Sequence, residues 1–71
     1  MTLGDKIAKL RAEHHLSQGD LAEKMGVSRQ SISKWETGSS IPDLDKLVTL
    51  SNLFDISLDA LVKTQEPKKE T

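Results

Sequence analysis

Signals that begin a helix recur at short intervals along this chain, and they restrict it to short helices. Each signal is a hydroxyl side chain of the kind that caps a helix, or a proline, which suits the first helical turn. These residues are Thr2, Ser17, Ser28, Pro42 and Ser57. Thr2 and Ser17 are each followed three residues later by an aspartate, which is the spacing of a capping box. Since no run of β-forming residues is long enough for a strand, the sequence predicts an all-α fold.

Apolar residues recur at helical spacing after each of these signals, so each signal is expected to open a helix. The predicted fold is a compact five-helix bundle, with helices at about residues 3–14, 18–25, 29–36, 42–54 and 58–62. Gly26 and Gly38 follow the second and third helices, where a glycine can adopt the left-handed conformation that ends a helix. Residues 64–71 are polar and cannot bury a face. We therefore expect one domain at residues 1–63, followed by a disordered tail or the start of a linker.

Composition excludes several classes of protein. A chain of 71 residues, 35% of them apolar, can build one small core, and a domain of this size rarely encloses a catalytic cleft. It has no cysteine, which excludes disulfides, thiolate zinc sites and cysteine nucleophiles. His14 and His15 would point about 100° apart on a helix, so we expect them at the surface without a metal. With no apolar run of membrane-spanning length and no signal peptide, the sequence predicts a cytoplasmic binding protein without a cofactor.

The second and third predicted helices are joined by only Gly26, Val27 and Ser28. Two short helices joined by a three-residue turn that contains glycine are typical of a helix-turn-helix motif. The outer face of the third helix would carry hydrogen-bonding side chains and no acid. Its residues are Ser28, Arg29, Gln30, Ser31, Ser33 and Lys34. The chain has a net charge of −1, and residues 43–59 hold four aspartates against one lysine. The outer face of the third helix, in contrast, carries Arg29 and Lys34 and no acid, so it is locally basic.

The Cro/xenobiotic-response-element (XRE) family of helix-turn-helix repressors is similar to this chain over about residues 3–62. The likeness rests on IAKLR in the first helix, LSQ entering the second, Leu-Ala and then Gly at the turn, SRQSISKWE in the third, and PDLDKL opening the fourth. The resemblance implies a lambda-repressor-like domain that binds double-stranded DNA with its third helix in the major groove. It also implies a transcriptional regulator, a repressor that occupies promoter DNA, and no enzyme.

The resemblance further implies roles for single residues. Arg29 and Gln30 would read base edges, since arginine pairs well with guanine and glutamine with adenine. Lys34 would contact a base or a phosphate, and Gln18 would hold a phosphate at the start of the second helix. Hydroxyl side chains at or after the third helix are candidate phosphate contacts. They are Ser28, Ser31, Ser33, Thr37, Ser39 and Ser40.

Three other residues are expected to be structural. Arg11 and Glu36 match family positions that form an internal ion pair, and Trp35 has core spacing from Ile32. The loop at residues 37–41 has no charge, whereas phage members of the family often have several lysines or arginines there. This departure predicts weak non-specific binding to DNA.

A monomer would read only a few base pairs, so we expect a homodimer on a pseudo-palindromic operator. The dimer contact is assigned to the fifth helix, through Leu58, Leu61 and Val62. No membrane or small-molecule partner is expected. Two other hypotheses stay open. The chain could be an antitoxin or the DNA-binding part of a longer regulator, or it could be a helical protein–protein adaptor, which the net charge and the uncharged loop favour.

Overall fold

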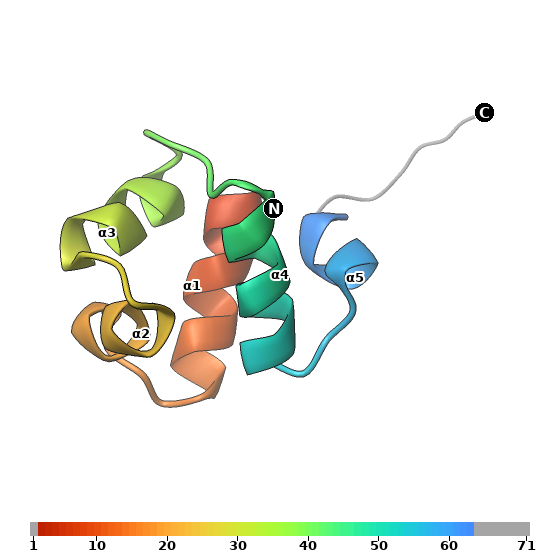
Figure 1. The fold of residues 1–71 in the computed structure, drawn as a ribbon, viewed down its shortest axis with the longest axis horizontal. Helices are drawn as coiled ribbons and strands as arrows, with labels where there is room; N and C mark the ends of the chain where they lie inside the picture. The colour runs from red at the N-terminus through yellow and green to blue at the C-terminus, as the bar shows by residue number, and fades with distance from the viewer. Residues whose placement is uncertain (1, 64–71) are drawn as a thin grey trace.

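The computed structural model describes residues 2–63, and these fold into five α-helices without a strand (Figure 1). The helices are α1 (Leu3–Glu13), α2 (Gln18–Met25), α3 (Arg29–Thr37), α4 (Leu44–Leu53) and α5 (Leu58–Val62). The five-helix bundle predicted from the sequence is confirmed. The tail or linker expected at residues 64–71 lies outside the described residues.

Capping side chains determine where the first two helices begin. The Thr2 hydroxyl accepts a hydrogen bond from the backbone amide of Asp5 at 3.1 Å, and the Asp5 carboxylate accepts one from the backbone amide of Thr2, also at 3.1 Å. The same exchange joins Ser17 and Asp20, at 2.9 Å and 3.0 Å. Both predicted capping boxes are therefore confirmed.

The fourth helix begins at Leu44, two residues after the predicted start at Pro42. The N-cap is Asp43, because its carboxylate accepts a 3.0 Å hydrogen bond from the backbone amide of Lys46. Pro42 precedes the helix and is buried. The prediction was wrong here because proline and aspartate both favour a helix start, and the carboxylate makes the hydrogen bond.

Helices α1 and α4 end on residues that are not glycine but adopt the left-handed conformation. His15 has a φ of 59° and Asp55 a φ of 56°. The backbone amides of His15 and Leu16 donate to carbonyls of the last turn of α1, both at 3.0 Å, in the pattern of a Schellman motif. These bonds end α1 one residue earlier than predicted.

The helices pack with α2 and α3 on one side of α1 and α5 on the other (Figure 1). α1 contacts α3 and α5, α2 contacts α3 and α4, and α4 contacts α5. α1 and α3 approach so closely at Gly4 that an added Cβ would lie 2.5 Å from the carbonyl oxygens of Trp35 and Glu36. Because this distance is far inside van der Waals contact, only glycine fits at that position.

The core is formed by apolar side chains that come from all parts of the described chain. They are Ile7, Leu10, Leu21, Ala22, Met25, Ile32, Trp35, Leu50, Phe54 and Leu61. Trp35 is buried, as predicted, and His14 and His15 are exposed, as predicted. The assignment of Leu61 to a dimer patch was wrong, because its side chain has no exposed surface and closes the core where α5 packs on α1 and α4.

Candidate nucleic-acid interface

Helices α2 and α3 are joined by a tight turn with a fixed backbone. Gly26 has a φ of 71°, the left-handed conformation predicted for it. The backbone amide of Val27 donates to the carbonyl of Ala22 at 3.0 Å, and Val27 packs half-buried against the core. α3 begins at once, because the Ser28 hydroxyl accepts a 3.1 Å hydrogen bond from the backbone amide of Ser31. The two helices therefore form one rigid unit.

The outer face of α3 presents the side chains that the sequence assigns to base reading. Arg29, Gln30 and Lys34 are exposed, and Ser33 is half-buried. An open hollow of about 450 Å³ is lined by Arg29, Gln30 and Ser33 together with Gln18 from α2. The structure thus brings Gln18 beside the predicted base-reading residues, although it comes from another helix.

Apart from Ser33, which is in the middle of the helix, the predicted hydroxyl contacts lie at the two ends of α3. At its start, the hydroxyls of Ser28 and Ser31 are hydrogen-bonded at 3.0 Å. At its end, the Thr37 hydroxyl donates to a backbone carbonyl at 3.3 Å and lies 3.1 Å from the Ser39 hydroxyl. Ser40 is half-buried, and its backbone amide donates to a carbonyl of α3 at 3.2 Å. A hydroxyl pair therefore flanks the exposed charged and amide side chains on each side.

The outer face of α3 is positively charged. The ion pairs among residues 2–63 are Arg11–Glu36 and Lys63–Asp59. Arg29 and Lys34 belong to neither pair, and the one acid of α3, Glu36, is bonded to α1. Both cations are therefore available to an anionic partner.

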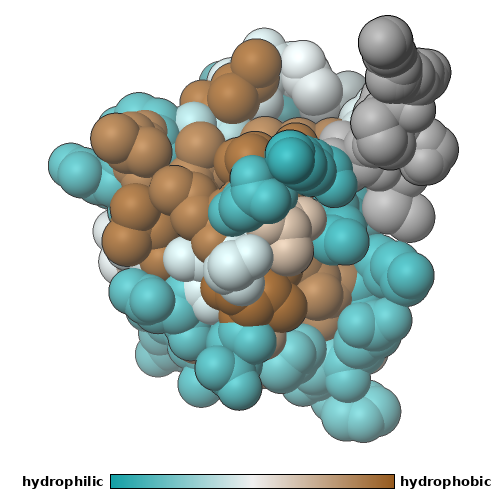
Figure 2. Space-filling model, turned by 90° about the vertical axis from the view of Figure 1, so that its right-hand side faces the viewer, coloured by the Kyte–Doolittle hydropathy of each residue, from teal (hydrophilic) through white to brown (hydrophobic). Residues whose placement is uncertain are grey.

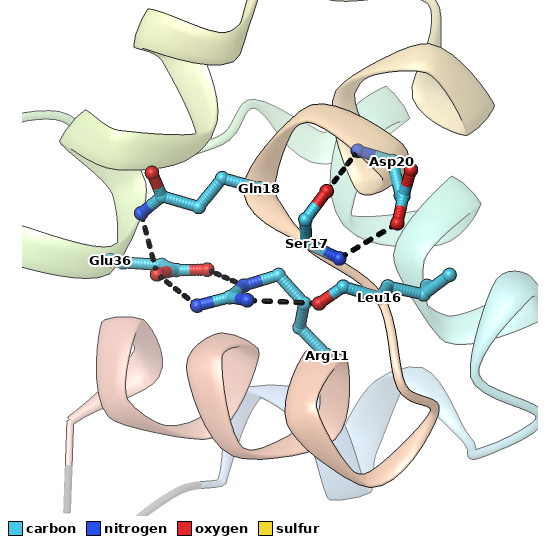
Figure 3. A network of polar contacts seen from close by, with 6 residues as sticks. All are labelled: Arg11, Leu16, Ser17, Gln18, Asp20 and Glu36. Carbon is cyan, nitrogen blue, oxygen red and sulfur yellow. Dashed lines mark hydrogen bonds and ion pairs between the residues drawn. The ribbon is translucent and has the colours of Figure 1, made fainter.

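Glu36 is the centre of a polar network that joins three helices (Figure 3). Arg11 donates to its carboxylate from Nε at 2.7 Å and from Nη2 at 3.1 Å. Arg11 also donates from Nη1 to the carbonyl of Leu16 at 2.9 Å. The hydrogen bond with Glu36 raises the pKa of Arg11 above its usual value, although burial opposes this. The ion pair implied by the family resemblance is confirmed.

The same carboxylate accepts a hydrogen bond that no pattern in the sequence indicates. Nε2 of Gln18 donates to Oε1 of Glu36 at 3.0 Å. The two residues are 18 positions apart and belong to different helices, so no local pattern connects them. Spacing alone leaves Gln18 as an ordinary first-turn residue, and its partner becomes visible only once α2 and α3 are packed.

A second helix with an acid-free outer face, held across the first by a three-residue turn, defines a helix-turn-helix domain. Comparison with known proteins agrees, because the helix-turn-helix family model matches residues 7–61. The chain belongs to the helix-turn-helix family, which confirms the resemblance drawn from the sequence. Within residues 2–63, no helix has the length and apolar character needed to cross a membrane.

Known proteins are similar to most of this chain. The HTH-type transcriptional activator BcrR of Enterococcus faecalis is 38% identical over 66 residues, which cover 93% of this chain and 32% of BcrR. The P22 c2 repressor in complex with a synthetic operator superposes with a TM-score of 0.84 and 31% identity, covering 92% of this chain and 98% of that one. The structure of SinR in complex with DNA superposes with a TM-score of 0.77 and 31% sequence identity, covering 84% of this chain and 97% of that one. The chain spans about a third to three fifths of the length of three of the curated relatives that it matches, BcrR and two HTH-type regulators of Bacillus subtilis.

Proposed function

We propose that this protein binds double-stranded DNA sequence-specifically and regulates transcription, with α3 lying in the major groove. The observation that carries this proposal is the outer face of α3, which exposes Arg29, Gln30 and Lys34 and no acid. The major groove of B-DNA admits an α-helix and presents a different set of donors and acceptors for each base pair. The likeness to P22 c2 and to SinR, both solved in complex with DNA, supports the binding of DNA.

Each part of the α3 face has a proposed role. Arg29 and Gln30 read base edges at the exposed start of the helix, and Lys34 contacts a base or a phosphate one turn later. Phosphates on either side are bound by the flanking hydroxyls and by nearby backbone amides. The flanking hydroxyls belong to Ser28, Ser31, Thr37, Ser39 and Ser40, and Ser33, in the middle of α3, is a further candidate.

The regulatory effect we propose is repression, because a small domain can block a promoter simply by occupying it. The likeness to the P22 c2 repressor supports repression over activation, whereas BcrR is an activator. On this proposal the protein is a binding module that catalyses no reaction and needs no cofactor. It acts in the cytoplasm of a bacterial cell, where the DNA is accessible.

The operator we propose is pseudo-palindromic and is bound by a homodimer through an apolar face on α4 and α5. Leu44, Val48 and Val62 are 65%, 41% and 44% exposed, and they lie on two helices that pack together. Figure 2 shows apolar residues gathered on this side of the molecule. This contact differs from the one expected from the sequence, which was Leu58, Leu61 and Val62. α4 contributes to it, whereas Leu58 packs against the core and Leu61 is buried in it.

Selection of bound sites from random duplex DNA tests the function directly. The wild-type chain should select two half-sites about 34–36 Å apart, one turn of DNA. Arg29→Ala or Gln30→Ala should each cost about 1–3 kcal/mol of binding and relax preference at one or two positions. Glu23→Ala, at an exposed position of α2, is the matched control. An unselective wild type, or an unchanged preference in both α3 variants, would contradict the assignment.

A helical protein–protein adaptor is the second candidate function, favoured by the net charge of −1 and the uncharged loop at residues 37–41. Salt dependence separates the two. Each phosphate neutralised on duplex DNA contributes about −0.9 to the slope of log affinity against log salt. With few cations near the interface, we expect a slope of about −3 to −6 for a dimer. A slope near zero would favour the adaptor.

A further inference from the structure

Gly19, in the first turn of α2, is a glycine that the backbone does not explain. Gly26 and Gly38 have positive φ angles, and at Gly4 an added Cβ would lie 2.5 Å from carbonyl oxygens of α3. Gly19 has no positive φ, and no backbone of another described helix lies within 4 Å of where its Cβ would be. A glycine inside a helix makes the helix less stable than an alanine would. The neighbouring side chains are then what distinguishes this position.

The side chain of Arg29 lies beside Gly19, although the two residues belong to different helices. A Cβ added to Gly19 would lie 4.0 Å from Cδ of Arg29 and 3.7 Å from the hydroxyl oxygen of Ser17. Both are ordinary van der Waals distances, so a methyl group fits there, but a larger side chain would meet the arginine or the helix cap. The stem of Arg29 therefore packs against the first turn of α2.

The contact with Gly19 involves only the stem of Arg29, and the guanidinium group stays available. Arginine can pack its methylene groups on a protein surface while its charged end remains in water. Arg29 as a whole is exposed and belongs to neither ion pair of the described chain. It borders the open hollow together with Gln30 and Ser33. A stem that is already packed has less freedom to lose when the guanidinium binds a partner.

We propose that Gly19 is a positioning residue for Arg29, and that its missing side chain leaves the space from which Arg29 reads a guanine. This proposal rests on the proposed binding of DNA by α3. Two hydrogen bonds from one guanidinium to O6 and N7 of guanine require the guanidinium plane in one orientation. A side chain larger than a methyl group at position 19 displaces the stem from α2, and the paired hydrogen bonds are lost.

Site selection with Gly19→Val and its matched control Gly19→Ala tests the positioning role. Valine branches at Cβ, so its methyl groups fill two of the three staggered directions and leave it little room to avoid Arg29. At the position that Arg29 reads, the preference for guanine should fall by about 5- to 150-fold in Gly19→Val, the equivalent of about 1–3 kcal/mol. The other positions should keep their preferences.

Gly19→Ala should keep the wild-type site profile and raise the melting temperature by about 2–8 °C, because alanine favours the helix and its methyl group fits. An unchanged profile in Gly19→Val would overturn the positioning role. An equal loss of preference in Gly19→Ala would also overturn it, since a methyl group at this position does not displace the stem.

Combination with Arg29→Ala shows whether Gly19 acts through the arginine. In the Arg29→Ala protein the stem is absent, so adding Gly19→Val should change operator affinity by no more than about twofold. An equal loss of affinity with and without Arg29 would mean that the valine disturbs DNA or α2 directly. That result would overturn the positioning role.

A measurement on the wild-type protein keeps the role testable if Gly19→Val does not fold. An Hα proton of Gly19 should show a nuclear Overhauser effect to the Hδ protons of Arg29, because it stands where the Cβ would be. Absence of this effect would overturn the positioning role. A wild type that selects no sequence would overturn the proposed function and this inference together. A selective wild type whose profile is unchanged in Gly19→Val would overturn this inference alone.

Discussion

Arg11 holds Glu36 where both side chains are largely buried, so its loss should destabilise the fold. The Arg11 and Glu36 side chains are 21% and 9% exposed. Breaking a buried ion pair costs about 3–5 kcal/mol, and breaking an exposed one about 0–1 kcal/mol. Since Arg11 is partly reached by solvent, we expect Arg11→Ala to lower the free energy of unfolding by about 3 kcal/mol, measured by urea titration.

The exposed pair Lys63–Asp59 is the internal control. Its atoms are 3.6 Å apart and its side chains are 70% and 72% exposed. Asp59→Ala should therefore change the free energy of unfolding by about 0–1 kcal/mol. If Arg11→Ala costs no more than Asp59→Ala, the Glu36 network contributes nothing beyond a surface ion pair.

Asp20 should make the stability of α2 depend on pH. The backbone amide of Ser17 donates to its carboxylate, and this hydrogen bond lowers the pKa of Asp20. A group whose pKa is lower in the folded state stabilises the fold above its unfolded pKa, about 3.9, and loses that contribution as the pH falls through the folded pKa. The melting temperature of Asp20→Asn should thus lie below wild type at pH 7, with a gap that closes below about pH 4.

The control for Asp20 is Glu23→Gln, at an exposed position later in α2. This substitution removes the same charge from the same helix but not from its capping box. A gap between wild type and Asp20→Asn that stayed constant down to about pH 3 would show that the carboxylate is not the source.

Individual residues were predictable where their role depends on near neighbours. The hydroxyls of Thr2 and Ser17 act through an aspartate three residues away, so the sequence contains both partners of each capping box. The bond from Gln18 to Glu36 depends on how two helices cross, and no spacing rule reports that. The Arg11–Glu36 pair was available only through the family resemblance.

At the scale of the helix, the ends of α1 and α4 are sites where stability can be gained. His15 and Asp55 hold left-handed conformations, which cost residues with a Cβ about 1–2 kcal/mol. His15→Gly should remove that strain and, after the larger entropy of glycine in the unfolded chain, raise the free energy of unfolding by up to about 1 kcal/mol. Ala12→Gly, inside α1, should lower it by about 1 kcal/mol. Thermal melts of both variants decide the matter, and a destabilised His15→Gly would contradict it.

The number and order of the helices were predictable because each has its own cap and apolar repeat. The exact residues at which the helices begin and end were less predictable. Pro42 and Asp43 both favour a helix start, and only the hydrogen bond from Lys46 selects between them. Likewise, the sequence gives no sign that a histidine will stand where a glycine usually ends a helix, because the conformation of His15 is set by the bonds around it.

At the scale of the whole molecule, the face proposed for the dimer should control self-association. Leu44 and Val48 are exposed, so Leu44→Asp or Val48→Asp should leave the melting temperature of the monomer nearly unchanged. Each should weaken both dimer formation and operator binding, because a buried interface must then accept an unpaired charge. Sedimentation at DNA-binding concentrations measures this, with Thr49→Asp, at a neighbouring exposed position of α4, as the control. A wild type that is monomeric both free and on its operator would contradict it.

Which apolar residues of α4 and α5 face outward was the least predictable part of the molecule. Leu61 and Val62 are neighbours of equal apolar character, yet one is completely buried and the other 44% exposed. A helix of five residues is too short for its apolar repeat to define a face, so the neighbours α1 and α4 decide which side chain is covered.

The contact at Gly4 makes the position of α3 independent of the side chains on its outer face. The backbone of α1 at Gly4 packs against the carbonyls of Trp35 and Glu36, so main-chain atoms help to set how closely α3 approaches α1. If Arg29, Gln30 and Lys34 contact bases as proposed, substitutions among them would exchange one set of base contacts for another without changing the position of the helix. New binding preferences can accumulate on such a scaffold by single steps, each starting from a protein that still folds and still docks in the same pose.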